Sequence, residues 1–390
     1  MAKRRFDLPG IQDLSKEQEA ARALPKAGQH LIVGGPGTGK SVLALIRTRR
    51  HQRDGDDYLF LVYNHLLNRA SGQLFGEGLK SETWIGWFQR MFWKATGKPA
   101  PLLPPRSNGA FRAIDWDGVE TILQSLPDST HAIDRPYLVI DEGQDMPLQF
   151  YESLVNLGFE NFFVTADQNQ QITDDNSSRQ DIENGLGVNT PDVKELTWNY
   201  RNRYPVARLA REFYTGDPAS PPPDLPSPGP SVGTVPRLCS YHPDHLDTVG
   251  RRILRLWDRD PRQLIGVIAP NNRVRERYLE ALQSADVSLD NSRPTIETFH
   301  GDHRPDVVFG EGGILLINAQ ACKGLEFDTV ILADIDEHLF NPRDPDAAKR
   351  LFYVMVARAK ERVFLFMKKC EHPIEKILPT DRSILQREEL

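Results

Sequence analysis

The sequence predicts an α/β protein with two parallel sheets, each flanked by helices. Eight short apolar runs recur along the 390 residues, four in each half, and each ends in small or polar residues. The runs are continuous rather than alternating, which is typical of strands buried on both faces. Helical patterns separate the runs, and a segment dense in proline divides the two halves.

Each apolar run is an expected strand. Those of the first half are residues 30–35, 59–63, 137–142 and 162–167, and those of the second half are residues 264–270, 313–319, 329–334 and 363–367. Amphipathic helical patterns follow the first and the fifth run, at residues 41–52 and 271–285. A strand followed by a helix and another buried strand is the pattern of a parallel sheet.

The proline-dense segment, residues 217–236, is the expected boundary between domains. Proline fixes φ and lacks a backbone donor, so this segment is predicted to be an extended and fairly stiff connector. A first domain of residues 1–216 and a second domain of residues 237–390 follow from it. Residues 88–135 carry few strand signals and several turn signals, and we expect a partly helical insertion there.

The amino-acid composition limits the classes of protein to which the chain can belong. Hydrophobic residues make up 39% and charged residues 26%, as in ordinary globular chains, and no apolar run is long enough to span a membrane. The N-terminus is basic but lacks the apolar core of a signal peptide. Three cysteines without CxxC spacing favour a reducing compartment, so a cytoplasmic location is expected. The net charge of −6 excludes a wholly basic surface for nucleic acid, although not a local basic groove.

The stretch GGPGTGKS fits a phosphate-binding loop. It follows a buried run and opens an amphipathic helix, which is the context that such a loop requires. Its glycines let backbone N–H groups converge on phosphate oxygens, Lys40 would reach the β and γ phosphates, and Ser41 would ligate Mg²⁺. The remaining residues of the predicted cradle are Gly34, Gly35, Pro36, Gly37, Thr38 and Gly39.

A second acidic motif, LVIDEGQD, lies about a hundred residues further on. Asp141 at the end of a strand would hold Mg²⁺, and Glu142 would orient or deprotonate an attacking water. An acidic pair after a strand is more often a surface turn, but after a phosphate-binding loop the catalytic interpretation is favoured. The two motifs together predict hydrolysis of a nucleoside triphosphate.

From about residue 14 to residue 360, the chain resembles the UvrD/Rep-type superfamily 1 helicases. The motif LSKEQEAA looks like their adenine-reading motif, with Gln18 facing the base, and VYNHLL and ETWIGWF take the places of two motifs near nucleic acid. The resemblance thus implies tentative nucleic-acid contacts by Asn64, Thr83 and Trp84. DEGQD matches the acidic motif of the family.

Four further motifs follow in the order of the family. ADQNQQI would place Gln170 at the γ-phosphate, and LTWNYRN would stack Tyr200 on adenine and bring Arg201 to the γ-phosphate. NAQACKGLEFD would face the nucleotide through Gly324 and Glu326, with Asn318 and Gln320 as tentative nucleic-acid contacts, and RLFYVMVARAKERV offers Arg358. The resemblance implies two RecA-like P-loop NTPase domains, an interdomain cleft for ATP and Mg²⁺, and single-stranded DNA as a partner.

Several departures from the family concern the nucleic-acid side. The residues after Gln170 read QITDDNSS, without the usual aromatic stacking residues and with two acids that would repel phosphates. Trp84 and Trp87 could replace that stacking platform, or they could be ordinary core aromatics. The accessory insertions of the family are also reduced, which leaves nearly the minimal two domains.

The leading hypothesis is therefore an ATP-dependent DNA helicase or translocase. An ATP-driven switch subunit that acts on a protein partner without translocation remains the alternative, and a P-loop kinase does not account for Arg201 and Arg358 together. A protein partner could also supply processivity or a nuclease. A zinc site at Cys239, His242 and His245 with His300 and His303 is less favoured than ordinary loop roles, because no CxxC pair accompanies it.

Overall fold

The computed structural model describes residues 6, 8–105, 112–126, 133–167, 176–215, 221–228, 234–299 and 307–390. The chain divides into two compact units, which are described separately here. The first unit contains Pro9–Val33 and Lys40–Leu196, and the second contains Gly34–Gly39 and Thr197–Leu390. Within the described residues, no helix is long and apolar enough to cross a membrane.

The first unit is built on a six-stranded sheet in the order β3-β2-β4-β5-β1-β6. The partners β1 and β5, β5 and β4, β4 and β2, and β2 and β3 all run parallel. The strands are β1 Gln29–Gly34, β2 Tyr58–Val62, β3 Ser81–Thr83, β4 Tyr137–Ile140, β5 Phe162–Ala166 and β6 Lys194–Leu196. The helices are α1 Lys16–Arg22, α2 Lys40–Asp54, α3 His65–Phe75, α4 Trp84–Thr96, α5 Trp116–Gln124, α6 Leu148–Asn156 and α7 Arg179–Leu186.

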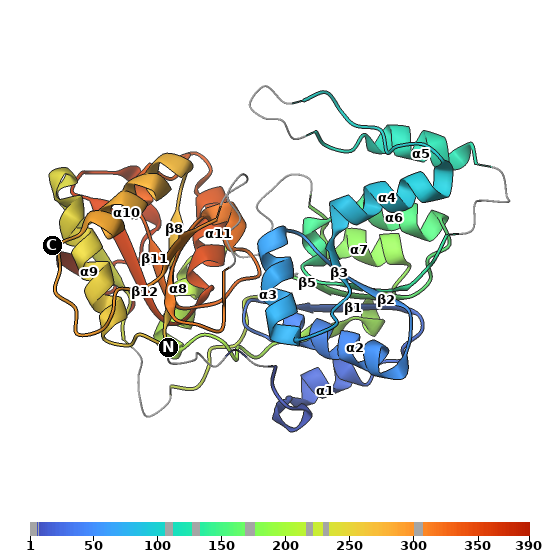
Figure 1. Cartoon of the computed structure of the whole chain (residues 1–390), viewed down its shortest axis with the longest axis horizontal. Coiled ribbons are helices and arrows are strands. Elements are labelled where there is room, and N and C mark those ends of the chain that lie inside the picture. Colours follow the sequence, from blue (N-terminus) through green and yellow to red (C-terminus); the bar gives the residue numbers. More distant parts are fainter. Residues whose placement is uncertain are drawn as a thin grey trace. The chain divides into compact units, whose positions relative to one another are not determined.

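The second unit is built on a seven-stranded sheet in the order β13-β7-β12-β11-β8-β10-β9, with parallel pairs throughout (Figure 1). Its strands are β7 Arg237–Tyr241, β8 Leu264–Ala269, β9 Ile296–Thr298, β10 Gly313–Asn318, β11 Phe327–Leu332, β12 Ala359–Lys368 and β13 Gln386–Glu389. Its helices are α8 Tyr204–Glu212, α9 Leu246–Asp258, α10 Asn272–Ser284 and α11 Pro345–Val356.

All eight apolar runs form the central strands of these sheets. Every residue of β2, β5 and β8 is buried, as expected of strands covered by helices on both faces. The helices α4 and α5 fall in or overlap residues 88–135, where the sequence predicted a partly helical insertion, and the insertion itself stays a prediction. The predicted α/β class with two parallel sheets is therefore confirmed.

The sequence did not predict the edge strands of either sheet, nor β7 beside one of those edges. β3, β6 and β9 have three residues each, too few for a run of apolar residues to stand out. β13 has the sequence QREE and is mostly exposed. Such strands are held by pairing with their neighbour rather than by burial, so they carry no hydrophobic signal.

Two acidic residues have left-handed backbone conformations directly after a buried strand. Glu142 follows β4 with φ of 56°, and Asp334 follows β11 with φ of 41°. Each starts a single 3-10 turn, which is closed by Asp145 N–H on the Glu142 carbonyl at 2.9 Å and by Glu337 N–H on the Asp334 carbonyl at 2.8 Å. This conformation costs a residue other than glycine about 1–2 kcal/mol, so the surrounding contacts must hold both turns.

Two parts of the predicted connector are described, namely residues 221–228 and 234–236. Asp224 N–H donates to the Thr197 carbonyl at 2.8 Å, and Arg211 Nη2 donates to the Pro223 carbonyl at 3.1 Å. Residues 221–228 therefore lie along the second unit, and the flanking residues 216–220 and 229–233 lie outside the described residues. The domain limits expected from the sequence stay a prediction.

Candidate nucleotide site

The predicted phosphate-binding loop is a tight turn between β1 and α2. Gly37 and Gly39 have φ of 80° and 91°, values that only glycine adopts readily. The Gly37 carbonyl accepts from Tyr200 N–H at 2.8 Å. A Cβ added to Gly37 would meet the Asn199 side chain at 2.4 Å, and one added to Gly35 would meet Pro223 at 2.4 Å. The glycines are therefore required by close neighbours as well as by the turn.

Lys40 is the first residue of α2 and is buried against an acid of the first unit. Its Nζ lies 3.2 Å from Asp167 Oδ2, and the two side chains are 7% and 0% exposed. Asp167 directly follows β5, and Lys40 opens the helix that follows β1, the strand that pairs with β5 in the sheet. A phosphate entering the loop would offer Lys40 a second anionic partner.

Asp141 follows β4 and is fully buried, and among the described residues only one of its two carboxylate oxygens is hydrogen-bonded. Oδ1 accepts from Thr165 Oγ1 at 2.7 Å, whereas Oδ2 has no hydrogen-bond partner among the described residues. Burial and the neighbouring Glu142 raise the pKa of Asp141 to about 6, while Thr165, Ser41 and Lys40 favour the ionised form. An oxygen-rich set with a spare carboxylate oxygen fits the ligand preference of Mg²⁺.

Gln144 joins the acidic motif to the end of β5. Its Nε2 donates to Glu142 Oε2 at 2.8 Å, and its Oε1 accepts from Asp167 N–H at 2.9 Å. The amide thus fixes the positions of Glu142 and Asp167 in one buried network. The sequence marked Gln144 only as part of a motif, because an amide between two acids has no periodic signal. Gln170, expected nearby, lies outside the described residues.

Gln18 is buried in α1 and takes part in a capping box. Its Oε1 accepts from Ser15 N–H at 3.0 Å, and Ser15 Oγ accepts from Gln18 N–H at 3.2 Å. The amide is thereby oriented at the start of the helix. The contact with adenine stays a prediction.

In the second unit, Arg201, Glu326 and Lys360 form a charged triad. Arg201 Nη2 lies 2.6 Å from Glu326 Oε1, and Lys360 Nζ lies 3.0 Å from Glu326 Oε2. Burial acts to raise the pKa of Glu326, but the two cations outweigh it and hold that pKa well below its usual range. The structure therefore brings together two residues that the sequence assigned to the nucleotide.

Three more predicted nucleotide residues lie in this unit. Arg358 is only 1% exposed, and its Nε donates to the Val354 carbonyl at 3.1 Å. Tyr200 is 55% exposed, so its ring is open to a stacking ligand. Gly324 has φ of 73°, which explains the glycine at that position.

The tentative nucleic-acid residues are scattered over several elements. Asn64 caps α3 by accepting from Leu67 N–H at 2.8 Å, and Thr83 precedes α4. Asn318 Nδ2 donates to Asn272 Oδ1 at 2.7 Å, and Gln320 is exposed. The contacts of these residues do not identify a surface that binds nucleic acid.

Trp84 and Trp87 lie on α4 and are each only 9% exposed. Both rings pack edge-on against Phe150, with centroids 5.3 Å and 6.4 Å from it, and Trp87 also packs against Phe159 at 5.8 Å. Base stacking needs an open ring face. The structure therefore favours the core alternative for both tryptophans, including the tentative nucleic-acid contact Trp84.

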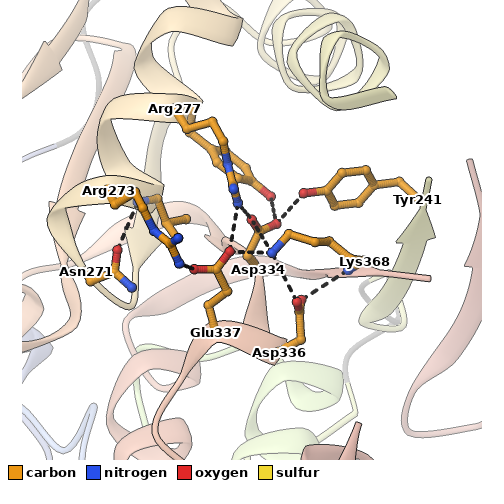
Figure 2. A network of polar contacts seen from close by, with 10 residues as sticks. Tyr241, Asn271, Arg273, Arg277, Asp334, Asp336, Glu337 and Lys368 are labelled. Carbon is orange, nitrogen blue, oxygen red and sulfur yellow. Dashed lines mark hydrogen bonds and ion pairs between the residues drawn. The ribbon is translucent and has the colours of Figure 1, made fainter. Parts of the chain in front are cut away.

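A second polar network surrounds Asp334 at the end of β11 (Figure 2). Asp334 is fully buried, and its Oδ1 accepts from Tyr241 at 2.5 Å and from Tyr278 at 2.8 Å. Arg277 pairs with its other oxygen and also with Glu337 at 3.2 Å. Unlike Asp141, this buried acid has every oxygen engaged, which indicates a structural role.

No cluster of three or more histidine, cysteine, aspartate or glutamate side chains that could hold a metal ion is found among the described residues. Cys239 is buried in the core, and burial raises the pKa of its thiol to about 11, which disfavours the thiolate that zinc requires. His300 and His303 lie outside the described residues.

Comparison with known proteins identifies one segment of the chain. The family model described as the UvrD-like helicase C-terminal domain matches residues 313–366. The resemblance to UvrD-type helicases predicted from the sequence is confirmed, and the UvrD-like segment includes Glu326, Arg358 and Lys360. No curated protein matches the chain significantly.

Two solved structures are similar to the chain. Saccharomyces cerevisiae Dbp5 bound to RNA and ADP BeF3 has a TM-score of 0.51 and 13% identity, over 97% of this chain and 90% of that one. The C-terminal domain of a possible DNA helicase from Lactobacillus plantarum has a TM-score of 0.36 and 15% identity, over 48% of this chain and 98% of that one. The likeness to Dbp5 shows the fold, and the prediction of two RecA-like domains is confirmed.

Proposed function

We propose that the chain is an ATP-dependent helicase or translocase that couples hydrolysis of Mg²⁺-bound ATP to movement on single-stranded DNA. The UvrD-like domain and the RecA-like fold make it a helicase-type protein. ATP, magnesium and single-stranded DNA belong to the proposal. The observation that carries it is the buried pair of Lys40, which opens α2 directly after the phosphate-binding loop, and Asp141, which follows β4 and keeps its Oδ2 without a partner among the described residues.

In this proposal Lys40 leaves Asp167 for the phosphates, and its ammonium then neutralises part of their charge. Asp141 and Ser41 would hold Mg²⁺, which polarises the phosphoryl group that is transferred. Asp141 offers the ion its spare Oδ2.

Glu142 is the proposed base for the attacking water. Gln144 holds its carboxylate from one side, so the acid has a defined orientation after its left-handed turn. Arg201 and Arg358 are proposed to stabilise charge on the transferred phosphoryl, and Gln170 to sense it. Arginines in that role contribute roughly a thousandfold or more in rate.

One observation favours the alternative of an ATP-driven switch that acts on a protein. Trp84 and Trp87, which could have formed a stacking platform for bases, are buried in the core. A switch subunit would hydrolyse ATP through the same residues and need no such platform.

Steady-state ATP hydrolysis, with and without a single-stranded oligonucleotide at low and moderate salt, tests the proposal. We expect single-stranded DNA to raise the rate about tenfold at low salt, and we expect salt to weaken the effect because phosphate contacts release counterions. Lys40→Ala should lose at least about a hundredfold in rate. Lys80→Ala, a lysine with a 61% exposed side chain, is the matched control and should keep its rate.

The outcomes separate the hypotheses. Full hydrolysis by Lys40→Ala would contradict any role of the loop in ATP chemistry. Hydrolysis that depends on Lys40 but ignores DNA would leave the ATPase in place and favour the switch.

A further inference from the structure

A cavity of about 610 Å³ lies within the second unit, apart from every residue assigned to the nucleotide. It is lined by residues of α9 and of the strands β7, β11, β12 and β13. In Figure 1, α9 lies at the end of the unit that also holds the chain's C-terminus. Pockets that bind small ligands have volumes of about 300–1,000 Å³, so this cavity has the size of a ligand site.

The lining is strongly basic. Two carboxylates, Asp260 and Glu388, face six arginines, which are Arg237, Arg251, Arg252, Arg255, Arg259 and Arg362. Glu388 already binds two of them, Arg252 at 2.8 Å and Arg237 at 3.1 Å. The cavity therefore carries an excess of positive charge in a chain whose net charge is negative.

Three of the arginines lack a compensating acid. Arg255, Arg259 and Arg362 form no ion pair with any residue that the structure describes. Arg251 and Arg255, four residues apart, lie on one face of α9, and Arg259 is the residue that caps the C-terminal end of this helix. Like charges at this spacing destabilise a helix.

The cavity also has an apolar side. Ile331, Phe364 and Phe366 line it and are at most 6% exposed, and Leu256 of α9 joins them. A ligand that fills the cavity would meet guanidinium groups with one part and an apolar wall with another. Guanidinium groups bind phosphate oxygens through paired N–H donors, whereas the compact ammonium group of lysine cannot.

We propose that this cavity is a second ligand site, which binds a nucleotide-sized phosphate ester. The phosphates lie against Arg255, Arg259 and Arg362, and the non-polar part of the ligand lies on Phe364. A walled cavity with an apolar side suits such a small molecule better than it suits the repeating backbone of a nucleic-acid strand. The site goes beyond the proposed function and does not depend on it.

The test measures binding of ADP by calorimetry to the full-length chain carrying Lys40→Ala, which weakens the phosphate-binding loop. Arg255→Gln with Arg259→Gln removes two exposed arginines that hold no ion pair, so the variant should fold. Arg343→Gln with Arg382→Gln is the matched control, since both residues are exposed, lie in the same unit and line no part of this cavity. The cavity variant should lose at least tenfold in affinity for ADP, and the control less than twofold.

Inorganic pyrophosphate and a ten-residue oligothymidylate are the comparison ligands. Pyrophosphate should bind at the same site at least tenfold more weakly than ADP, because it lacks a part for the apolar wall. Equal loss of ADP binding in the two double variants, or no saturable binding in the Lys40→Ala chain, would overturn the proposal. The proposal would also be overturned if the oligothymidylate displaced ADP and bound more tightly than ADP, since the arginines would then bind a nucleic-acid strand.

Discussion

Arg201 and Glu326 bind each other, with Nη2 and Oε1 2.6 Å apart and Nε donating to the same oxygen at 2.8 Å. The sequence assigned both residues to the nucleotide, Arg201 to the γ-phosphate and Glu326 to a position that faces the nucleotide. A phosphate that binds Arg201 must therefore compete with the Glu326 carboxylate. If Arg201 moves to the phosphate, Lys360 still pairs with Glu326. Because of this pairing, we expect substitution of Arg201 to lower the rate of ATP hydrolysis more than the affinity for the nucleotide.

Arg201→Ala should lower kcat for ATP hydrolysis by roughly a thousandfold, while the nucleotide Kd changes by less than tenfold. The physical reason is that an arginine acting on developing charge contributes mainly in the transition state. Arg203→Ala is the control, because Arg203 is half exposed and its ion pair with Glu361 is long, at 3.7 Å. Equal losses of kcat in the two variants would contradict a special role for Arg201.

Asp141→Asn should stabilise the ligand-free protein at pH 8. Burial and Glu142 raise the pKa of Asp141 to about 6, above its value in an unfolded chain, so the native state is penalised once the pH exceeds both values. Removing the charge should gain on the order of 2 kcal/mol at pH 8. The gain should shrink towards pH 4, where the native carboxyl is protonated. Thermal melts at both pH values check the sign.

The same variant should lose ATP hydrolysis, because an amide is a poor ligand for Mg²⁺. Asp286→Asn, at an exposed position of the second unit, is the control and should change neither stability nor rate. An Asp141→Asn protein that melts lower than wild type at pH 8 would show that the acid is stabilised by contacts and is not strained by burial.

Trp87→Leu should destabilise the protein by about 2–4 kcal/mol, because it leaves a gap beside Phe150 and Phe159. Trp93→Leu on the same helix is the matched control, since that ring is 59% exposed, and it should cost less than about 0.5 kcal/mol. Urea unfolding measures both. A large loss of affinity for single-stranded DNA in Trp87→Leu, at unchanged stability, would restore the stacking alternative.

Asp334→Asn should cost about 1–3 kcal/mol, because the change leaves the partly exposed Arg277 without the charge of Asp334 and gives two tyrosine hydroxyls a poorer acceptor. Tyr241→Phe removes only one of these hydrogen bonds and should cost about 1 kcal/mol. Asp244→Asn, whose side chain is 85% exposed, serves as the surface control in the same chemical denaturation experiment. A cost below that of Tyr241→Phe would contradict the structural role of the network.

The central strands and the phosphate-binding loop could be predicted from the sequence because their signals are local. A run such as residues 162–167 is apolar because both faces of β5 are covered, and Gly37 is a glycine because its φ is positive. The edge strand β13, with the sequence QREE, carries no such signal. Nor do contacts between distant residues, such as Gln144 with Asp167 or Arg201 with Glu326, because nothing in their spacing marks them.

The arginines of α9 illustrate the same limit. Their spacing of four residues is visible in the sequence, but a solvated helix face would show it equally well. Only the structure places Arg255 and Arg259 beside Arg362 of β12 at one cavity.

Glu142 and Asp334 share a backbone conformation that few side chains adopt, each at the second residue after a parallel strand and each opening the same short turn. The buried acids of the two turns are used differently. Asp141, beside the first turn, keeps one oxygen without a hydrogen-bond partner among the described residues, whereas Asp334, in the second turn, is bound by two tyrosine hydroxyls and by Arg277. The same short turn thus leaves one buried acid able to accept a further ligand and holds the other entirely within the fold.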